Sequence, residues 1–588
     1  MSGSAEKRCI PWTITAALLA LALSVLRAFY LEQYIGAYTS CHGCFLMPAL
    51  GHDAWLLAAV FLLLGLATGV KPRWLRILLS VLAALTILAQ AVDLSVLRLF
   101  NQRLYWADLL RFSGDIAAGW SVARAQFFSA NATVYDGIAA FVIVVLVGVV
   151  AGARRSLPQA RTLFLMAVAE TVFGVIMLWA PLRYVHDQFA WNVIGANLPQ
   201  GRAQEFSPAF AQREWRLGIA QPKICSTGTR SGRNIVIVIT ESLSAYQSAL
   251  LGGPYDWLPR LDAIARANHY FTHFYANGFT TDGGEIAILT GRPPLIPPGT
   301  LMYAMSGFGP GEDTLPSIAH RAGYATYYFT ATDLSFEDSG PWLRSLDFDG
   351  VEGNESPFYA GMPRGQFGGI EDGVLFARFE QWLERRQDPR PFVAVLLTIS
   401  SHPPFVDPRT SRIDPAGSFG YVDAQLADFH DALAKRSFFA NGILLITGDH
   451  RSMTPILGAE YRRFGERAFA RIPLIVSGDV NMPKVVNAAF QQTDFAASLA
   501  HIMGVDYCRT AFNGIFLDVH PQPAQYVTQA RGDDRNRVDV YFDDRIAGYL
   551  EDGDASRWIG PPPANASALA AWINVQRIRN TGTIPAPR

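Results

Sequence analysis

The chain has 588 residues, of which 50% are hydrophobic and 17% are charged, whereas an ordinary soluble protein carries about 25% charged residues. A formal net charge of -1 excludes the strongly basic surface of a dedicated nucleic-acid-binding protein. The high aliphatic and aromatic content also excludes a disordered or fibrous chain. A membrane protein remains, provided that the apolar residues are concentrated in long runs.

Five long apolar runs occur in the first part of the chain, and each predicts a helix that crosses the membrane. Each run is close to the roughly 20 residues that span about 30 Å of hydrocarbon as a helix. None of them shows the polar stripe that a surface helix of a soluble protein carries. The runs are Pro11–Leu31, Ala54–Val70, Trp74–Leu97, Val134–Ala153 and Thr162–Leu182.

Lysine and arginine are concentrated in alternate connections, which predicts the orientation of these helices. They occur before the first run, between the second and third, and between the fourth and fifth, whereas the connection between the first and second has none. Arg103, Arg111 and Arg124, between the third and fourth runs, weaken this bias. The N-terminus is therefore expected in the cytoplasm and, after five crossings, the chain beyond Leu182 outside it. The basic residues are Lys7, Arg8, Lys71, Arg73, Arg76, Arg154, Arg155 and Arg161.

Beyond a connector of mixed composition, short β-branched runs alternate with helical stretches. Asn234–Thr240 (NIVIVIT) is apolar between its two end residues, as expected of a parallel strand buried on both faces. The alternation predicts an α/β domain with a mostly parallel sheet and helices on both of its faces. The other expected strands are Tyr324–Thr330, Phe392–Ile399, Gly442–Thr447 and Ile472–Val476, and the expected helices include Leu315–Ala322, Glu371–Arg385 and Tyr421–Lys435.

These patterns divide the chain into four parts. The parts are a five-helix transmembrane domain over 1–186, a connector over 187–232, the α/β domain over 233–521, and an appended segment over 522–588. In the appended segment, VDVYFDD followed by RIAGYLEDG predicts a hairpin, and a final helix is expected near Ala566–Arg577. Cys225 and Cys508 both lie beyond the membrane domain, and the sequence leaves their pairing open.

Polar side chains stand at the ends of the predicted elements. Glu241 follows the first strand, and Asp449 and His450 follow the fourth. In parallel sheets ligands bind beyond the carboxyl ends of the strands, so these side chains are expected at one edge. Thr280, in NGFTTDGGE, opens a predicted helix, and a helix N-terminus favours a phosphate group. Such a donor set suits one Mn²⁺ or Zn²⁺ ion, beside which a threonine alkoxide becomes a competent nucleophile.

Each of these residues taken singly has a simpler interpretation. A carboxylate after a strand is more often a helix cap or a surface charge, and a threonine before an apolar run is more often an N-cap. It is their combination at strand and helix ends that favours catalysis.

The segments NIVIVITES, GFTTDGGE, SSHPPF and LLITGDH, in this order, resemble the alkaline phosphatase superfamily. More narrowly, they resemble its membrane-anchored lipoteichoic acid synthases and related phosphoglycerol or phosphoethanolamine transferases. This resemblance implies a multi-pass protein of the bacterial cytoplasmic (inner) membrane, with a sulfatase-like catalytic domain in the periplasm. It implies metal ligands at Glu241, Asp449 and His450. Thr280 falls on the catalytic threonine of the synthase pattern Gly-x-Thr-Ser-Asp and would complete the coordination.

The resemblance also implies a substrate site around the nucleophile. Thr281 and Asp282 fall on the serine and aspartate of the same pattern, and Thr281 remains a rival nucleophile because sequence does not separate adjacent hydroxyls. His402 is implied near the phosphate, as a hydrogen-bond donor or general acid; its alternative is a loop histidine beside two prolines. Asp333 and Trp342 bound a segment that is expected to contribute to the headgroup pocket, although this segment departs from the synthase pattern.

The expected reaction is a two-step transfer of phosphoglycerol. The Thr280 alkoxide attacks phosphatidylglycerol, diacylglycerol leaves into the bilayer, and a hydroxyl of an envelope glycan or glycolipid resolves the phospho-threonine intermediate. The choice of donor rests on cysteines, which in the phosphoethanolamine branch flank the catalytic threonine. Here no cysteine lies between Cys225 and Cys508.

Three alternatives remain open. The first is a phosphoethanolamine transferase that uses phosphatidylethanolamine. Asp282, Glu285 or Asp333 could pair with the ammonium group of this lipid. The second is a phosphodiesterase with water as the acceptor, and the third is a non-catalytic regulator that uses the same fold to bind lipid. A sulfatase is not expected, because no C/S-x-P-x-R segment lies near Thr280.

Overall fold

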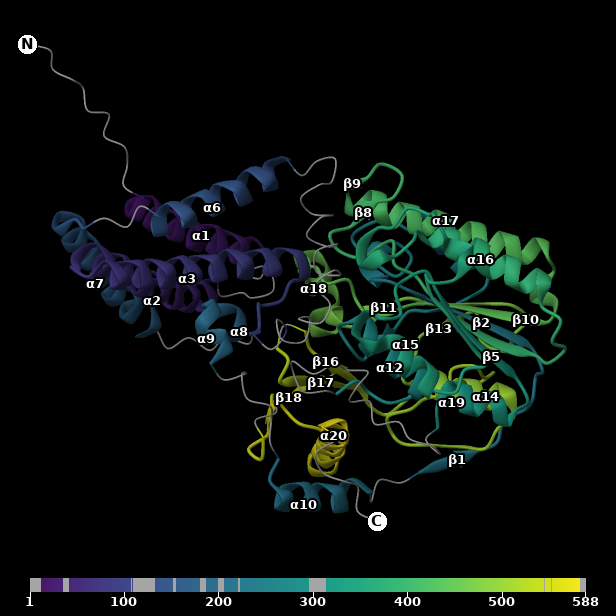
Figure 1. Ribbon diagram of the computed structural model, residues 1–588. Coiled ribbons are helices and arrows are strands. Elements are labelled where there is room, and N and C mark those ends of the chain that lie inside the picture. Colours follow the sequence, from purple (N-terminus) through teal and green to yellow (C-terminus); the bar gives the residue numbers. More distant parts are fainter. Residues whose placement is uncertain are drawn as a thin grey trace, which may run out of the picture. The chain divides into compact units, whose positions relative to one another are not determined.

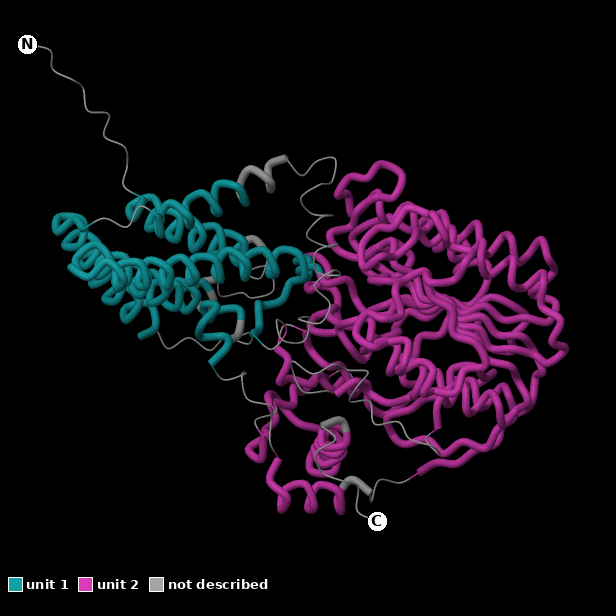
Figure 2. Tube along the Cα trace, in the orientation of Figure 1, with its two compact units in different colours: residues 1–106, 132–201, 454–458 teal, residues 107–131, 202–453, 459–588 magenta. Residues whose placement is uncertain are grey.

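The chain folds into two compact units, which are coloured separately in Figure 2. Unit 1 comprises residues 1–106, 132–201 and 454–458, and unit 2 comprises 107–131, 202–453 and 459–588. The computed structural model describes residues 12–34, 42–106, 108, 133–151, 155–179, 187–198, 206–219, 223–295, 313–532, 534–543, 545–550 and 553–581.

Unit 1 contains the apolar helices expected from the sequence. Four of them are long and apolar enough to cross a membrane, and the fully described part of the remaining one, Ala139–Ala151, is shorter. The second helix begins at His42 rather than near Ala54 and continues through Pro48. The prediction of an N-terminal helical membrane domain is therefore confirmed, with four to five spans. The helices are α1 (Trp12–Tyr34), α2 (His42–Gly69), α3 (Arg73–Phe100), α6 (Thr133–Ala151) and α7 (Leu157–Trp179).

Glycines bring α2 and α7 into close contact. A Cβ atom added to Gly51 would lie 2.8 Å from Leu178 Cγ, and one added to Gly174 would lie 2.3 Å from Trp55 Cδ1. Apolar side chains gain little from leaving lipid for another helix, so membrane helices associate through such close packing of small residues.

Four buried charges also connect the helices of unit 1. Arg27 of α1 pairs with Asp53 of α2 at 2.6 Å, and Arg103, just after α3, pairs with Asp93 of α3 at 2.7 Å. Both guanidinium groups also donate to the backbone carbonyl of Phe189, at 2.5 and 3.3 Å. A buried ion pair repays its desolvation only where further hydrogen bonds satisfy it, which these carbonyl contacts help to do.

Unit 2 is built around an eight-stranded sheet with the order β13-β3-β12-β10-β2-β7-β5-β6. The five strands from β10 to β6 run parallel, whereas β12 is antiparallel to both of its neighbours. A mostly parallel sheet is therefore confirmed. The strands are β2 (Asn234–Thr240), β3 (His269–Phe271), β5 (Ala325–Thr330), β6 (Gly350–Glu352), β7 (Phe392–Leu397), β10 (Gly442–Gly448), β12 (Leu474–Ser477) and β13 (Val485–Val486).

Alternate residues of the central strands enter two separate hydrophobic cores. In β2, Ile235, Ile237 and Ile239 belong to one core, and Val236 and Val238 to the other. Each such buried side chain contributes about 1.5–3 kcal/mol. Figure 1 shows α16 and α17 on one face of the sheet and α14 and α19 on the other. The covering helices are α11 (Pro259–Ala267), α12 (Thr281–Thr290), α14 (Leu315–Arg321), α16 (Asp372–Arg385), α17 (Pro415–Lys435) and α19 (Asp494–Met503).

One predicted strand was wrong in extent. Ile472–Val476 was expected as a single strand, but Pro473, which has no N–H to donate, separates two. The first, β11 (Arg471–Ile472), pairs with β4 (Phe274–Tyr275) in a small sheet, and the second is β12 of the large sheet.

The C-terminal segment adds a four-stranded antiparallel sheet and a helix. The hairpin predicted from the sequence is confirmed as β17 and β18, and the final helix extends to Thr581. Within the connector, α10 (Pro208–Ile219) packs against this final helix through Trp215, Val575 and Ile578. The elements are β16 (Val527–Ala530), β17 (Arg537–Phe542), β18 (Arg545–Leu550), β19 (Arg557–Ile559) and α20 (Ala566–Thr581).

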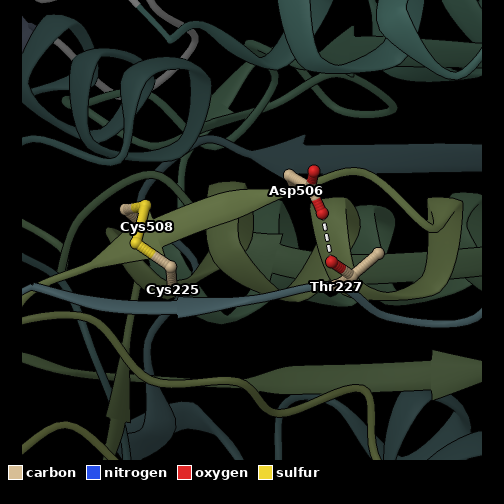
Figure 3. Close-up of a disulfide and its surroundings, with 4 residues drawn as sticks. All are labelled: Cys225, Thr227, Asp506 and Cys508. Atoms are coloured by element: carbon tan, nitrogen blue, oxygen red, sulfur yellow. Dashed lines mark hydrogen bonds between the residues drawn. A yellow bond between two sulfur atoms is a disulfide. The ribbon is translucent and has the colours of Figure 1, made fainter.

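A disulfide joins Cys225 to Cys508 and settles the pairing that the sequence left open. It links the short strand β1 (Ile224–Ser226), before the first strand of the large sheet, to β15 (Tyr507–Arg509), after α19. Thr227 donates a hydrogen bond to Asp506 beside it (Figure 3). The bond closes a loop of 283 residues, which contains most of the α/β domain.

Replacing Cys225 with serine is expected to lower the free energy of unfolding of unit 2 by about 2–4 kcal/mol, because the disulfide restricts the unfolded chain. Chemical denaturation of the detergent-solubilised protein measures the change. Reductant should produce the same loss in the wild type and none in the variant. An unchanged denaturation midpoint in Cys225→Ser would contradict this role.

Candidate metal centre and nucleophile loop

The register of three parallel strands brings the polar loops together. Thr240 lies opposite Gly448 across the β2–β10 pair, and Ile239 lies opposite Leu397 across the β2–β7 pair. The residues that follow these strands therefore leave the sheet at the same edge. Thr398 confirms the proximity, because its hydroxyl accepts a hydrogen bond from the Glu241 N–H at 3.1 Å.

Glu241, Asp449 and His450 form a cluster that could hold a metal ion. One ligand atom from each lies within 4.8 Å of the other two, and the three residues are at most 1% exposed. His450 Nε2 lies 3.3 Å from Asp449 Oδ2 and 3.6 Å from Glu241 Oε1. The structure thus brings together the three side chains that the sequence placed at two different strand ends.

Neighbouring groups orient each member of the cluster. The N–H groups of Ser242 and His450 both donate to Asp449 Oδ1, at 2.7 and 2.6 Å. The Ser242 hydroxyl donates to Glu241 Oε1 at 2.7 Å. His450 Nδ1 lies 2.9 Å from the Arg451 carbonyl, which can only accept, so Nδ1 carries a proton and Nε2 is the nitrogen that faces the carboxylates.

Three buried atoms at this site have no hydrogen-bond partner in the described part of the chain: Asp449 Oδ2, His450 Nε2 and Thr280 Oγ1. Leaving a buried polar atom unsatisfied costs about 1–3 kcal/mol. A divalent cation would satisfy all three, and carboxylate oxygens with one imidazole nitrogen fit Mn²⁺ or Zn²⁺. The residues present therefore fit the metal that the sequence predicts.

The pKa values of the two carboxylates are displaced in opposite directions. Burial and the charge of Glu241 raise the pKa of Asp449 well above its ordinary value. Burial also acts to raise the pKa of Glu241, but the charges of His402 and His450 and the hydrogen bond from Ser242 bring it below its ordinary value. A bound divalent cation would favour the charged form of both carboxylates.

The loop that carries Thr280 contacts the cluster at the start of α12. Thr280 is the N-cap residue of α12, but its side chain makes no capping hydrogen bond, so its hydroxyl is not committed to the helix. The next hydroxyl, Thr281 Oγ1, donates to Glu241 Oε2 at 3.0 Å. A Cβ atom added to Gly284 would lie 2.2 Å from the Asp449 carbonyl oxygen. The first turn of α12 therefore packs directly on the loop that carries Asp449 and His450.

His402 lies on the loop after β7, and its charge interacts with Glu241 and His450. Burial lowers its pKa, whereas Glu241 acts to raise it. Its Nδ1 lies 2.7 Å from the Pro403 carbonyl and 3.1 Å from Gln366 Oε1, and two acceptors at this nitrogen fix its proton there. No motif in the sequence predicted a role for Gln366.

The two carboxylates near Thr280, those of Asp282 and Glu285, both accept hydrogen bonds from other groups of the protein. Asp282 is buried, and its Oδ1 accepts a hydrogen bond from the Gly283 N–H at 2.9 Å. Glu285 is also buried and accepts a hydrogen bond from the Tyr328 hydroxyl.

The two ends of the predicted headgroup segment differ in their surroundings. Asp333 is exposed, and its Oδ1 accepts hydrogen bonds from the N–H and hydroxyl of Ser335. Trp342 is 5% exposed and belongs to the same apolar core as Leu334 and Leu343. Only Asp333 is therefore at the surface, where a headgroup could reach it.

Asp372, at the start of α16, is a further site residue that the sequence did not reveal. Its Oδ1 accepts hydrogen bonds from the N–H groups of Ile399 and Ser400, both at 2.9 Å, and so shapes the loop that carries His402. Burial raises the pKa of Asp372 to about 6, although these hydrogen bonds act to lower it. An aspartate at a helix start has no sequence feature that separates this role from ordinary capping.

Known proteins match the part of the chain that carries this site. Residues 233–505 match the Sulfatase protein family. Phosphoglycerol transferase I of Shigella flexneri is 23% identical over 332 residues, which is 53% of this chain and 41% of that protein. The enzyme of the same name from Escherichia coli O157:H7 gives the same identity and coverage. The chain thus spans well under half the length of the curated relatives that it matches.

Solved structures show the same fold. A protein of the alkaline phosphatase superfamily from Vibrio parahaemolyticus superposes with a TM-score of 0.50 at 18% identity, covering 64% of this chain and 96% of that one. The lipoteichoic acid synthase LtaP of Listeria monocytogenes gives a TM-score of 0.44 at 17% identity, over 63% of this chain and 97% of that one. The Sulfatase match over 233–505 and the fold shared with the Vibrio parahaemolyticus protein agree with the resemblance drawn from the motifs.

Adding Mn²⁺ or Zn²⁺ to the metal-free protein is expected to raise its unfolding temperature, because a ligand at 100 times its Kd stabilises the folded state by about 2.7 kcal/mol. Asp449→Asn should abolish this shift. Asp262→Asn is the matched control, since Asp262 is another buried carboxylate that accepts hydrogen bonds from Ser248 and Leu250, outside the cluster. Equal stabilisation of Asp449→Asn and wild type by the metal would contradict the assignment.

Proposed function

We propose that the protein is a metal-dependent transferase that moves phosphoglycerol from phosphatidylglycerol to an envelope glycan or glycolipid. The observation that carries the proposal is the uncommitted Thr280 hydroxyl at the N-terminus of α12, beside the buried cluster of Glu241, Asp449 and His450. The match to phosphoglycerol transferase I supports the class of transferred group.

In the first step, the Thr280 hydroxyl proton passes to His402 Nε2 as Thr280 Oγ1 bonds to the donor phosphorus. The bond from phosphorus to the diacylglycerol oxygen breaks, and this oxygen takes the proton from His402. In the second step, the acceptor hydroxyl gives its proton to His402 and bonds to phosphorus, and Thr280 Oγ1 leaves and is reprotonated. Each step thus makes one P–O bond and breaks one, as expected of covalent catalysis.

Two features of the site would lower the barrier. A divalent cation held by Glu241, Asp449 and His450 would lower the pKa of the Thr280 hydroxyl and offset charge on the phosphoryl oxygens. The first N–H groups of α12 provide the partial positive charge of a helix N-terminus at the same place.

The engagement of the nearby carboxylates favours phosphatidylglycerol over phosphatidylethanolamine. An ammonium headgroup would need a free carboxylate, but Glu285 is buried against Tyr328, and Asp282 is buried with its Oδ1 on the Gly283 N–H. Asp333 remains exposed, and phosphatidylethanolamine is accordingly the second candidate donor.

A non-catalytic lipid-binding regulator is disfavoured, because such a protein has no need of a complete ligand set beside an uncommitted hydroxyl.

We place the N-terminus in the cytoplasm and the catalytic domain in the periplasm. The distribution of lysine and arginine supports this orientation. The Cys225–Cys508 disulfide supports it too, since disulfides persist in oxidising compartments. A lipid donor also accounts for membrane anchoring, which holds the site near the headgroups.

Thr280→Ala is expected to abolish headgroup transfer, because it removes the nucleophile, whereas Thr281→Ala should keep measurable transfer. Diacylglycerol release and trapping of the phosphorylated protein measure the two steps. If Thr281→Ala loses the phosphorylated intermediate while Thr280→Ala keeps it, the nucleophile is the other threonine.

Labelled phosphatidylglycerol is expected to yield diacylglycerol with the purified protein, and phosphatidylethanolamine to yield little. Each lipid is supplied separately in detergent with Mn²⁺. Product released from phosphatidylethanolamine alone would overturn the donor assignment and leave the threonine mechanism intact. Release of free glycerol phosphate, without a modified acceptor, would instead indicate a phosphodiesterase.

A further inference from the structure

A buried network of side-chain amides lies behind the candidate site. Asn277 precedes the nucleophile, and Gln491 and Gln492 lie just before α19. All three are fully buried, and none of the motifs in the sequence includes the two glutamines. Burying an amide is costly unless its donors and acceptors are satisfied, so such a network specifies one arrangement of the segments that it joins.

Gln492 connects the metal-ligand loop to the nucleophile loop. Its Nε2 donates to the carbonyl oxygens of Gly448 and Asp449, at 2.9 and 2.5 Å. Its Oε1 accepts the Asn277 N–H at 3.0 Å. The Gln492 side chain therefore holds the backbone of Asp449, a metal ligand, and the backbone of Asn277, three residues before Thr280.

Asn277 extends the connection to the C-terminal sheet. Its Nδ2 donates to Gln491 Oε1 and to the Thr528 carbonyl, both at 2.7 Å, and its Oδ1 accepts the Thr493 N–H at 3.0 Å. The Asn277 carbonyl accepts the Ala530 N–H at 2.8 Å. Thr528 and Ala530 belong to β16, which lies beyond the part of the chain that matches the Sulfatase family.

We propose that the Asn277–Gln492 amide pair is a positioning device that sets the spacing between Thr280 and the metal ligands Asp449 and His450. Asn277 also holds the backbone of Thr528 and Ala530 in β16. This inference rests on the proposed function for its catalytic consequence, whereas its effect on the metal centre can be measured without any substrate.

The physical reason lies in the packing of the two loops. The first turn of α12 touches the Asp449 carbonyl so closely that Gly284 has no room for a side chain. Gln492 donates to that same carbonyl, so it fixes both the position of the ligand loop and the surface on which α12 rests. Groups that hold ligands in place typically change metal affinity or activity by about 10–100-fold when they are removed.

Gln492→Met tests the proposal, because it removes the amide while keeping the length of the side chain. Gln529→Met is the matched control: Gln529 is also buried, donates to the Phe469 carbonyl at 2.8 Å and accepts from Tyr541 at 2.6 Å, but touches neither loop in these contacts. Asn277→Asp provides a second variant that keeps the Oδ1 acceptor and removes the two donated hydrogen bonds.

Four quantities are measured on the full chain in detergent: the free energy of unfolding, the Kd for Mn²⁺ titrated into the metal-free protein, and kcat and KM for phosphatidylglycerol. We expect Gln492→Met to weaken Mn²⁺ binding and lower kcat, each by about 10–100-fold, with KM changed less. Asn277→Asp should lower kcat more than it weakens Mn²⁺ binding, since it acts on the nucleophile side. Gln529→Met should lose stability only.

The proposal is overturned if folded Gln492→Met keeps the wild-type Kd for Mn²⁺ and the wild-type kcat. It is also overturned if Gln529→Met weakens Mn²⁺ binding as much as Gln492→Met does, because the effect would then follow from lost stability. If the wild type binds Mn²⁺ but transfers no headgroup, the proposed function fails, and the Kd values alone decide the positioning role.

Discussion

The parallel register of β2 and β10 is the constraint on which the candidate site depends. Thr240 stands opposite Gly448, so Glu241 and Asp449 leave the sheet side by side. A shift of one residue would turn every side chain of a strand to the other face and bury the wrong set. The apolar residues that fill the two cores therefore also fix the distance between the two carboxylates. In this sense the metal centre is specified by hydrophobic packing several residues away.

Holding three ionisable groups in the interior is costly, and the backbone around them is shaped to offset the cost. Ser242 adopts a φ of 57°, a left-handed conformation that is uncommon outside glycine, and its N–H and hydroxyl serve Asp449 and Glu241. Such strain persists where the surrounding contacts determine the conformation. These contacts leave Asp449 Oδ2 and His450 Nε2 without a hydrogen-bond partner, in the cluster whose ligand atoms lie within 4.8 Å of one another.

Unit 1 also buries charged side chains, and there they are paired with one another. Arg27 and Arg103 are each paired with an aspartate, and both use the carbonyl oxygen of Phe189 as a further acceptor. Each guanidinium group thus has a carboxylate and a backbone carbonyl oxygen beside it. In a low-dielectric setting such paired charges help to fix how helices pack, whereas an unpaired charge would be strongly destabilising.

The sequence by itself determined the features that depend on local pattern. Apolar runs marked the membrane helices, alternation of runs and helical stretches marked the parallel sheet, and residues at the ends of elements, such as Glu241 and Thr280, marked the candidate site. The tertiary structure alone placed Gln366, Asp372 and Gln492, paired Cys225 with Cys508, and reversed the direction of β12. The reason is physical: an amide, a carboxylate or a thiol acquires its role from a partner far away in the sequence, and no periodicity records that partner.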